Sequence, residues 1–231
     1  MRFAIIAAGE GSRLAREGLK EPKPLVPING IPMIERLTGI LMRQGADRMA
    51  VIINGKHAET RALLERMSRR MPVDLVVRDT LSPMHSLLAL APFLDCDRFC
   101  ALTVDTVFQE ERFSRMIAEF TKTESDGIMG VTSFVDDETP LYVSVDDSMD
   151  IQGFHDVEEG CHFVSAGIYC LKRKSLDILS RCVEEGGSRM RLFQRRLIEE
   201  GMRLKAFDLG RVIDVDHLSD VRKAEQIEQE G

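Results

Sequence analysis

The chain has 231 residues, of which 44% are hydrophobic and 30% are charged. This is enough apolar sequence for one large α/β domain or two small ones, and it excludes a chain that is disordered throughout. The formal net charge of −7 argues against a general nucleic-acid binder, because such a protein needs a net basic surface.

The first predicted element is a buried strand that ends at a glycine-rich loop. Residues 2–7 form an apolar run of strand length, and a helix-compatible stretch follows the loop. Gly9 and Gly11 have no Cβ atom, so an anion can approach the backbone N–H groups of the loop closely. Arg13 and Lys23 follow and supply two cations suited to phosphate. The segment therefore predicts a phosphate-binding loop.

Two common phosphate loops do not fit this segment. The dinucleotide fingerprint needs a third glycine where the chain has Leu14, and an acidic residue where the next strand ends in Asn54. The phosphate loop of the common ATPases needs Gly-Lys-Ser/Thr five residues after Gly9, where the chain has Leu-Ala-Arg. The loop is of another type.

The first half of the chain alternates predicted strands with predicted helices. After the first strand, further strands are expected at 49–53, 73–77 and 99–104. Helices are expected at 31–44, 57–70 and 82–94, the last with Ser82 as its N-cap and Pro83 at its first position. This alternation predicts an α/β fold with a doubly wound, mostly parallel sheet.

The second half of the chain is richer in strands. Strands are expected at 127–134, 142–145, 151–154, 162–171, 204–208 and 212–215, and helices at 112–121, 175–185, 190–200 and 219–229. The turn-rich residues 146–150 indicate a hairpin. No repeat or linker interrupts the chain, so we expect one domain, residues 1–231, with two halves of about 1–110 and about 111–231.

Two separated blocks carry a family resemblance. They are Ala-Ala-Gly-Glu-Gly-Ser-Arg-Leu at 7–14, and Pro-Lys-Pro-Leu-Val-Pro at 22–27 with Gly-Ile-Pro-Met-Ile at 30–34. In order and spacing they closely resemble the signature of the sugar-phosphate nucleotidyltransferases, which join a nucleoside triphosphate to a phosphorylated acceptor. The resemblance implies a Rossmann-like fold of the nucleotide-diphospho-sugar transferase type. The first half would bind the nucleotide, and the second would carry the acceptor in a small β-rich lobe.

The resemblance also implies which residues bind the nucleotide. Arg13 and the loop N–H groups would hold the β- and γ-phosphates, and Lys23 would lie at the α-phosphate, so these two are the predicted catalytic residues. His85 and Ser86 begin a helix where relatives receive the base and ribose, but a surface role for them is an equal alternative. The predicted nucleotide-binding set is Ala7, Ala8, Gly9, Gly11, Ser12, Arg13, Lys23, His85 and Ser86.

Asp105, Asp214 and Asp216 are the candidate magnesium ligands, and they follow predicted strands of the sheet. The carboxyl ends of parallel strands form the edge where such sheets bind ligands. The resemblance implies that Asp105 holds a Mg²⁺ ion that bridges the two sets of phosphates. We favour Asp214 as its partner, and expect the two to converge on one ion. The alternatives are a turn or cap role for Asp105 and an N-cap role for Asp216.

The acceptor site is predicted from Ser-Ala-Gly-Ile-Tyr at 165–169, which resembles the Asn-Ala-Gly-Ile-Tyr string of the family. Ser165 and Gly167 would thus lie beside the acceptor. The family asparagine is Ser165 here, and Phe-His-Asp-Val-Glu at 154–158 replaces the Glu-Lys-Pro segment of many sugar-specific members. These departures count against a hexose 1-phosphate in particular. Relatives of this length use acceptors that range from sugar 1-phosphates to phosphocholine and related alcohol phosphates.

Two other functions are compatible with parts of the sequence. A glycosyltransferase of related fold could use Asp-Val-Asp at 214–216 as its metal site, but this leaves the glycine loop and Lys23 unexplained. A non-catalytic nucleotide sensor would not need both magnesium positions and both loop cations. The expected reaction is attack by an acceptor phosphate on the α-phosphorus of the triphosphate, with release of pyrophosphate. The sequence does not name the base.

The remaining features bear on location and partners. The five cysteines form no Cys-x-x-Cys pair, as is typical of free thiols in a reducing cytoplasm. The N-terminus is predicted to be a core strand rather than a signal peptide, and no apolar run is long enough to span a bilayer. We therefore expect a cytoplasmic protein with no membrane or nucleic-acid partner. Arginine clusters at 66–70 and 189–196 are either solvated helix faces or anion sites.

Overall fold

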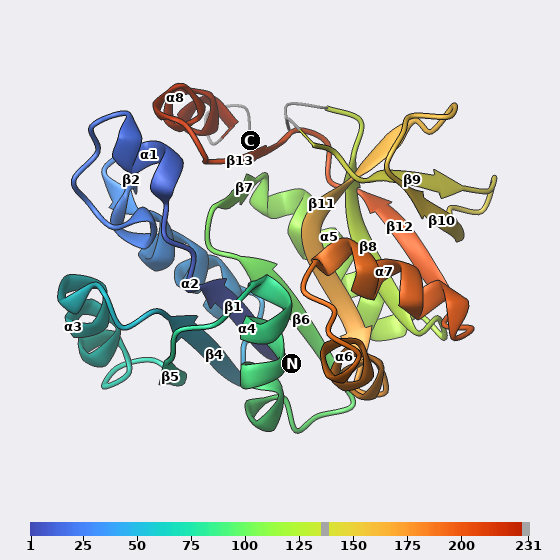
Figure 1. Cartoon of the computed structure of the whole chain (residues 1–231), viewed down its shortest axis with the longest axis horizontal. Helices are drawn as coiled ribbons and strands as arrows, with labels where there is room; N and C mark the ends of the chain where they lie inside the picture. The colour runs from blue at the N-terminus through green and yellow to red at the C-terminus, as the bar shows by residue number, and fades with distance from the viewer. Residues whose placement is uncertain (135–138, 228–231) are drawn as a thin grey trace.

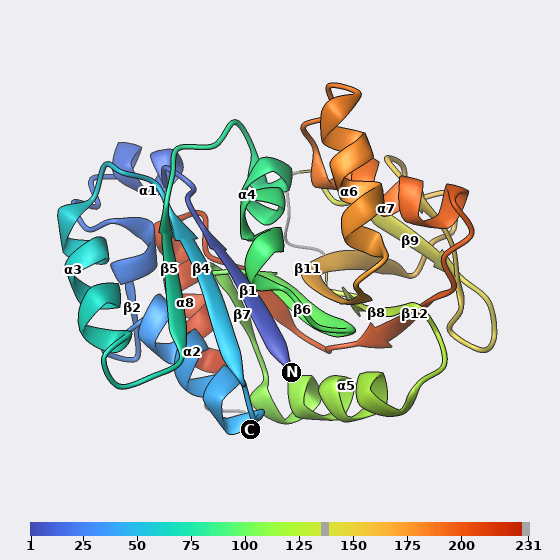
Figure 2. The same cartoon turned by 90° about the horizontal axis from the view of Figure 1, so that it is seen from below.

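The computed structural model of the chain describes residues 1–134 and 139–227. Within these ranges a nine-stranded sheet runs through the molecule, with helices packed on both of its faces (Figures 1 and 2). The α/β class predicted from the sequence is confirmed, and most of the predicted elements are present with small shifts at their ends. The two halves of the sheet differ in strand direction.

The first half of the sheet is parallel. Its strands are β1 (Arg2–Ala7), β4 (Arg48–Ile53), β5 (Val73–Val77) and β6 (Arg98–Thr103). β1 lies between β4 and β6, and β5 lies outside β4. Ala7 pairs with Ile53, and Ile6 pairs with Thr103, so the carboxyl ends of these strands are level with one another. Whatever follows them in the sequence is therefore delivered to one edge of the sheet.

The second half of the sheet is built around one long strand. Its strands are β8 (Gly127–Thr132), β9 (Tyr142–Val145), β10 (Ile151–His155), β11 (Phe163–Lys172) and β12 (Leu204–Asp208). β11 is antiparallel to β6, β8 and β9, and the predicted hairpin is formed by β9 and β10. β12 runs parallel to β8. The antiparallel part is the β-rich lobe that was expected in the second half of the chain.

Alternation along the strands divides the core into two layers. Phe3 and Ile5 face one layer, and Ala4 and Ile6 face the other, because successive side chains of a strand point to opposite faces. The first layer is covered by α2 (Met33–Arg43), α3 (Ala58–Met67), α5 (Glu110–Lys122) and α8 (Leu218–Ile227). The second layer is covered by α4 (Pro83–Leu90), α6 (Ser175–Glu184) and α7 (Met190–Glu199).

Two short strand pairs were not predicted. β2 (Pro27–Ile28) and β3 (Ile31–Pro32) form a hairpin whose turn residues, Asn29 and Gly30, both have positive φ angles of 49° and 80°. The helix predicted at 31–44 begins only at Met33, because Ile31 pairs with Ile28 in this hairpin. The predicted end of the last helix, at residue 229, lies outside the described residues.

The second unpredicted pair joins distant parts of the chain. β7 (Thr106–Phe108) is antiparallel to β13 (Val212–Asp214), and Asp214 lies opposite Thr106. This pairing places the C-terminal acidic segment beside the end of β6.

In the described ranges no helix combines the length and the apolar character that crossing a membrane requires. All five cysteines are free thiols, and three of them are buried.

Candidate active site

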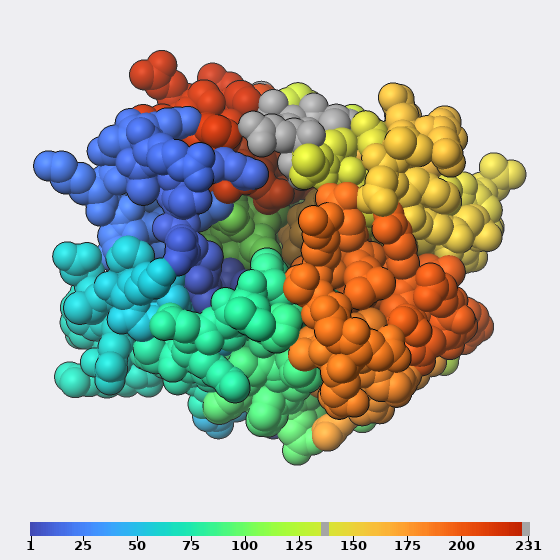
Figure 3. All heavy atoms as spheres, viewed as in Figure 1, coloured from blue at the N-terminus to red at the C-terminus, as the bar shows by residue number. Residues whose placement is uncertain are grey.

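A cleft lies at the carboxyl edge of β1 and β6, and it has two compartments. The first has a volume of about 410 Å³ and is lined by the glycine loop, Lys23 and Asp105. The second, about 220 Å³, is lined by Ser165 and Asp214 among others. Arg13 and Asp216 line both compartments, so the two are adjacent. Figure 3 shows the molecule hollowed between its blue N-terminal segment and its orange segment near residues 175–200.

The glycine loop is open on the side that faces the first compartment. A Cβ atom built on Gly9 would have no heavy atom within 4 Å, so space remains beside the backbone there. Gly11 has a φ of +61°, and a Cβ atom on it would lie 2.9 Å from the Cβ of Lys23. The left-handed backbone and the close approach both require glycine at this position. The short helix α1 (Ser12–Arg16) follows directly.

Lys23 lies at the centre of the site. It begins a 3-10 turn, Lys23–Leu25, and its side chain is only 9% exposed. Its ammonium forms ion pairs with Asp105 and with Asp216, the latter at 2.7 Å. Burial is the largest influence on the pKa of Lys23 and lowers it, but the two carboxylates together raise it above the ordinary value. The ammonium therefore stays charged, and the two carboxylates that share it lie close together.

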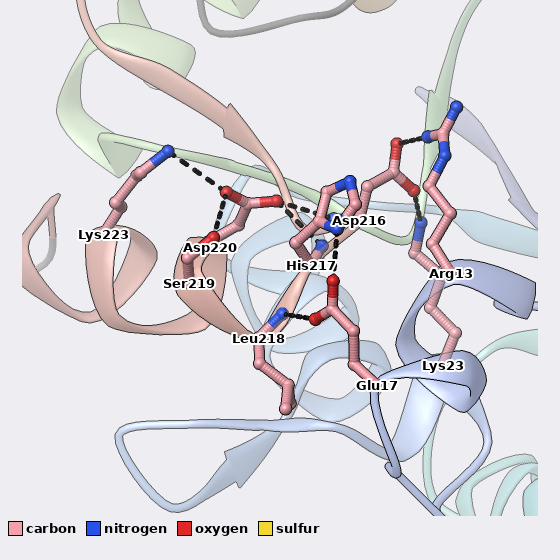
Figure 4. Close-up of polar contacts among 9 residues, drawn as sticks. All are labelled: Arg13, Glu17, Lys23, Asp216, His217, Leu218, Ser219, Asp220 and Lys223. Carbon is pink, nitrogen blue, oxygen red and sulfur yellow. Dashed lines mark hydrogen bonds and ion pairs between the residues drawn. The ribbon is translucent and has the colours of Figure 1, made fainter.

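Arg13 is joined to the same cluster from the solvent side. Its Nη1 lies 2.5 Å from Oδ2 of Asp216, while Lys23 contacts the other oxygen of that carboxylate (Figure 4). Arg13 is 45% exposed, so this pair is open to water and to solutes. The two predicted catalytic cations thus converge on one carboxylate at the mouth of the first compartment.

The geometry does not favour the alternative in which Asp216 caps the last helix. The N-terminal N–H groups of α8 have other acceptors: Leu218 donates to Glu17 Oε2 at 2.7 Å, and His217 donates to Asp220 Oδ2 at 2.8 Å. Figure 4 shows the Asp216 side chain directed away from the helix. Its carboxylate therefore does not cap the helix, and it faces Arg13 and Lys23 in the cleft.

Asp214 completes the group of carboxylates. Its Oδ1 accepts a hydrogen bond from Thr106 Oγ1 at 2.8 Å, and Thr106 is hydrogen-bonded to Thr103 at 2.6 Å. The residue is exposed and lines the second compartment, where neighbouring protein atoms displace part of the water around its carboxylate. This desolvation, followed by the charge of Asp105, raises the pKa of Asp214 to about 7. A cation placed between Asp214 and Asp105 would offset the repulsion between their negative charges.

The predicted convergence of the acidic residues agrees with the geometry. Besides the β7–β13 pairing, Val215 N donates to the backbone oxygen of Asp105 at 3.1 Å, which holds the two segments together. Asp216 is linked to Asp105 through Lys23, and Asp214 interacts with Asp105 through its charge. Whether Asp214 or Asp216 is the second metal ligand stays a prediction.

The bonding of the Asp105 carboxylate indicates whether a metal ion fits here. Its Oδ1 is buried and has no hydrogen-bond partner among the described residues, while its Oδ2 contacts Lys23. A buried carboxylate oxygen without a donor is a position that a cation would satisfy. No group of three or more His, Cys, Asp or Glu residues in the described ranges is arranged to hold a metal. Mg²⁺ is often held by one or two carboxylates together with water and substrate phosphates, and Asp105 with Asp214 or Asp216 would supply such a donor set.

The predicted acceptor residues lie in or beside the second compartment. Ser165 lines it, and its hydroxyl donates to Oε1 of the buried Gln194 at 2.9 Å. Gly167 has a φ of +70° at an irregularity of β11, and a Cβ atom there would lie 3.5 Å from Thr106 Oγ1. Both residues therefore flank the strand pair that carries Asp214.

At the start of α4, the residue that lines the first compartment is not one of the two that were predicted to contact the nucleotide. Ser82 caps the helix as predicted, with His85 N donating to its Oγ at 3.4 Å. The lining residue is Pro83. Ser86 is buried and shares a hydrogen bond with Thr80 at 2.6 Å, and His85 Nδ1 lies 2.9 Å from Ser82 Oγ. Nucleotide contact by His85 or Ser86 stays a prediction.

Of the other predicted loop residues, some line the first compartment and one is hydrogen-bonded to the neighbouring strand end. Ala7 and Ser12 line the first compartment, whereas the backbone oxygen of Ala8 accepts a hydrogen bond from Asn54 Nδ2 at 3.1 Å. Arg16 and Thr103 also line the compartment and were not predicted. The sequence signal for Thr103 was its place at the end of a parallel strand.

The chain is similar in sequence to a known protein family and to individual characterised proteins. Residues 3–201 match the family described as the MobA-like NTP transferase domain. A bifunctional IPC transferase and DIPP synthase from Rubrobacter xylanophilus is 27% identical over 97% of this chain and 51% of its own length. A CMP-5'-(3-aminopropyl)phosphonate synthase from Streptomyces rubellomurinus is 30% identical over 51% of this chain and 19% of its own length. The chain spans about half the length of the first relative and less of the second.

A solved structure gives the fold comparison. The inositol-1-phosphate CTP transferase from T. maritima superposes with a TM-score of 0.80 at 19% identity, covering 100% of this chain and 96% of that one. The fold expected from the alternation of strands and helices and from the two resembling sequence blocks is thereby confirmed.

Proposed function

The chain belongs to the MobA-like NTP transferase family, and from this premise we propose that it is a nucleotidyltransferase that joins a nucleoside triphosphate to a phosphorylated small molecule. Pyrophosphate is the second product. The observation that carries the proposal is the position of Lys23, which is held between Asp105 and Asp216 beside an open glycine loop. A polyphosphate and its counter-ion need such an arrangement of cations and carboxylates.

Nucleotide binding would exchange the partners of both cations. The loop N–H groups and Arg13 hold the β- and γ-phosphates, and Lys23 lies at the α-phosphate. Each cation is now paired with a carboxylate, so each is already oriented toward the cleft. The phosphates would replace these carboxylates as partners, which would leave the carboxylates available to hold a metal ion.

The reaction forms one bond to phosphorus and breaks another. An oxygen of the acceptor phosphate attacks the α-phosphorus, and the bond from the α-phosphorus to the bridging oxygen of pyrophosphate breaks. A phosphate monoester is largely dianionic at neutral pH, because its second pKa is about 6, so no general base is required. The residues of the cleft align the two phosphates and neutralise the charge that moves to the leaving pyrophosphate.

We propose Mg²⁺ as the cofactor. Asp105, with its unpaired buried oxygen, and either Asp214 or Asp216 would hold the ion. When bound, the ion would neutralise charge on the two sets of phosphates and orient them toward each other.

The relatives suggest which substrates to test first. The names of the Streptomyces relative and of the T. maritima structure both point to a cytidine nucleotide, so CTP is the first donor to try. Their acceptors are a phosphonate and an alcohol phosphate. Sugar 1-phosphates and alcohol phosphates such as phosphocholine complete the acceptor class. A cytoplasmic location fits substrates of this kind.

The test is release of pyrophosphate from CTP, UTP, GTP and dTTP in turn, each with a panel of phosphorylated acceptors. We expect turnover that needs both substrates and that EDTA abolishes and Mg²⁺ restores. Hydrolysis or transfer of sugar from a nucleotide sugar without pyrophosphate release would indicate a glycosyltransferase. Nucleotide binding without turnover for any acceptor would indicate a sensor, and either result would overturn the proposal.

A further inference from the structure

A second charged pocket lies outside the cleft, at the turn between α6 and α7. It has a volume of about 400 Å³, and its charged lining residues are Arg189, Arg191, Arg195 and Asp156. We propose that this arginine pocket, Arg189, Arg191 and Arg195, binds a second acidic group of the acceptor. The inference rests on the proposed function and narrows its acceptor class to phosphorylated compounds that carry a carboxylate or a further phosphate.

Two of the three arginines are held in place by the protein. Arg191 contacts Asp156 Oδ1 at 2.5 Å and donates to the backbone oxygen of Thr139 at 3.1 Å. Arg195 contacts Asp156 Oδ2 at 2.8 Å and donates to the backbone oxygen of Phe154 at 3.0 Å. Their side chains are about 30% exposed or less, so both are partly buried. Because a guanidinium has five N–H donors, each keeps donors for an incoming anion without losing its orientation.

The pocket carries an excess of positive charge. Asp156 is the one acidic residue among its lining residues, and it faces three guanidinium groups. Arg189 is exposed, and no partner for its guanidinium is found within 1–134 and 139–227. Gly186, Gly187 and Ser188 also line the pocket and carry no charge. An anion is the ligand that this charge distribution would attract.

Buried residues connect the arginine pocket with both compartments of the cleft. Gln194 lies between Arg191 and Arg195 in the sequence of α7. Its side chain accepts a hydrogen bond from Ser165, which lines the second compartment. On the other side, a Cβ atom on Gly187 would lie 3.0 Å from the side chain of Met84, the neighbour of the lining residue Pro83. In Figure 3 the orange segment that contains α6 and α7 forms one wall of the hollow. In the proposed arrangement, an acceptor reacts in the cleft and directs its other end toward the arginines.

The charge of the pocket separates three kinds of acceptor. A carboxylate or second phosphate would gain charge-assisted hydrogen bonds to the guanidinium groups. A neutral polyol would gain little, and a quaternary or primary amine would be repelled. The proposed preference excludes choline-like and amine-bearing acceptors, and in this respect the chain would differ from the Streptomyces relative, whose name includes an aminopropyl group.

The experiment compares three acceptors of similar size: phosphoglycerate, glycerol phosphate and phosphocholine. Each is assayed with the best triphosphate for wild type and for Arg189→Gln, with Arg69→Gln as a matched exposed arginine in the other cluster. We expect Arg189→Gln to raise the KM for phosphoglycerate about tenfold, as the loss of one charge-assisted contact predicts. The KM for glycerol phosphate, the KM for the triphosphate and kcat should stay within twofold, and Arg69→Gln should match wild type.

A binding measurement keeps the test independent of turnover. Calorimetric titration of phosphoglycerate into wild type and Arg189→Gln, without nucleotide, should show about tenfold weaker binding to the variant. If Arg189→Gln binds phosphoglycerate as wild type does, or if it weakens the binding of glycerol phosphate equally, the arginines do not recognise a second acidic group. A wild-type preference for phosphocholine would also overturn the inference while leaving the proposed function standing. Absence of pyrophosphate release with every donor and acceptor would instead overturn the proposed function.

Discussion

The two ends of the central sheet each gather lysine and aspartate side chains, and the two clusters differ in how completely they are paired. At the carboxyl end of β6, Lys23 lies between Asp105 and Asp216. At the amino end, Asp126 lies 2.8 Å from Lys174 Nζ and 3.5 Å from Lys172 Nζ. The central side chain of each cluster, Lys23 or Asp126, is 9% exposed, so burial alone does not distinguish them.

The difference lies in the remaining hydrogen bonds. Both oxygens of Asp126 have donors, since Oδ1 takes the lysines and Oδ2 takes the backbone N–H of Arg203 at 3.0 Å. Its own backbone N–H also donates to the oxygen of Arg203 at 2.7 Å, which ties β8 to β12. At the other end, Asp105 Oδ1 has no donor in the described part of the chain, and the cluster borders an open pocket. A saturated cluster stabilises the fold, and an unsaturated one can exchange partners with a ligand.

The largest effect that this comparison predicts is for Asp105→Asn. The substitution removes the charge of the carboxylate that we propose as a ligand of Mg²⁺ and whose Oδ1 has no donor in the described residues. We expect kcat/KM to fall on the order of a thousandfold at saturating Mg²⁺, with the unfolding temperature nearly unchanged. Pyrophosphate release and thermal unfolding measure the two quantities. Metal-dependent turnover within tenfold of wild type would contradict the assignment, and parallel Asp214→Asn and Asp216→Asn variants would identify the second ligand.

Loss of either cation at the same end should have the next largest effect. Lys23→Ala and Arg13→Ala each remove a proposed contact to phosphate, which would strengthen as charge moves to the leaving group. We expect each to lower kcat on the order of a hundredfold without unfolding the protein. Circular dichroism checks the fold, and Arg69→Gln supplies the control for a change of surface charge. Wild-type rates in both variants would mean that the glycine loop does not serve nucleotide transfer.

Much of the fold was predictable because long strands and helices have clear hydrophobic patterns. The two short strand pairs were not: β2, β3 and β7 have only two or three residues, too few to show a period, and the strand expected at 212–215 gave no sign of its partner. The Asn29-Gly30 turn was a local signal for one of them, because this dipeptide favours the two-residue hairpin turn. The β7–β13 pair had no such signal, as it joins segments about a hundred residues apart.

The members of the site were more predictable than their partners. Strand ends in a parallel sheet meet at one edge, so Asp105 and the glycine loop could be placed together from sequence. The ion pair of Lys23 with Asp216 spans 193 positions and depends on side-chain orientation, which no sequence pattern encodes. For the same reason, the sequence did not reveal that Pro83 lines the first compartment while Ser86 is buried.

The saturated cluster at the amino end should affect stability and leave catalysis intact. Asp126→Asn replaces a buried, charge-assisted acceptor with a neutral amide, one of whose two ends is a donor facing lysines. We expect the free energy of unfolding to fall by about 1–3 kcal/mol, which corresponds to several degrees in unfolding temperature. Urea unfolding measures the change, and kcat at a temperature where both proteins are folded should stay within twofold. A fall in kcat as large as that of Lys23→Ala would erase the distinction between the two ends.

The smallest expected effect is the pH dependence of that difference. Burial raises the pKa of Asp126, but Lys174, the Arg203 N–H and Lys172 together lower it by more, so the net pKa lies below its usual value. A carboxyl group whose pKa is lowered by folding contributes stability that is complete above its unfolded pKa of about 3.9. That contribution is lost as the pH falls through the lowered folded value, because protonation then removes the charge that the lysines bind.

The stability advantage of wild type over Asp126→Asn should therefore be constant from about pH 7 to pH 5 and shrink below about pH 4. The asparagine does not titrate, so the difference between the two proteins isolates this one group from the general effect of acid. Urea unfolding of both proteins at a series of pH values measures it. An advantage that grows as the pH falls would mean that Asp126 is held with a raised pKa, and that the lysines do not govern this end of the sheet.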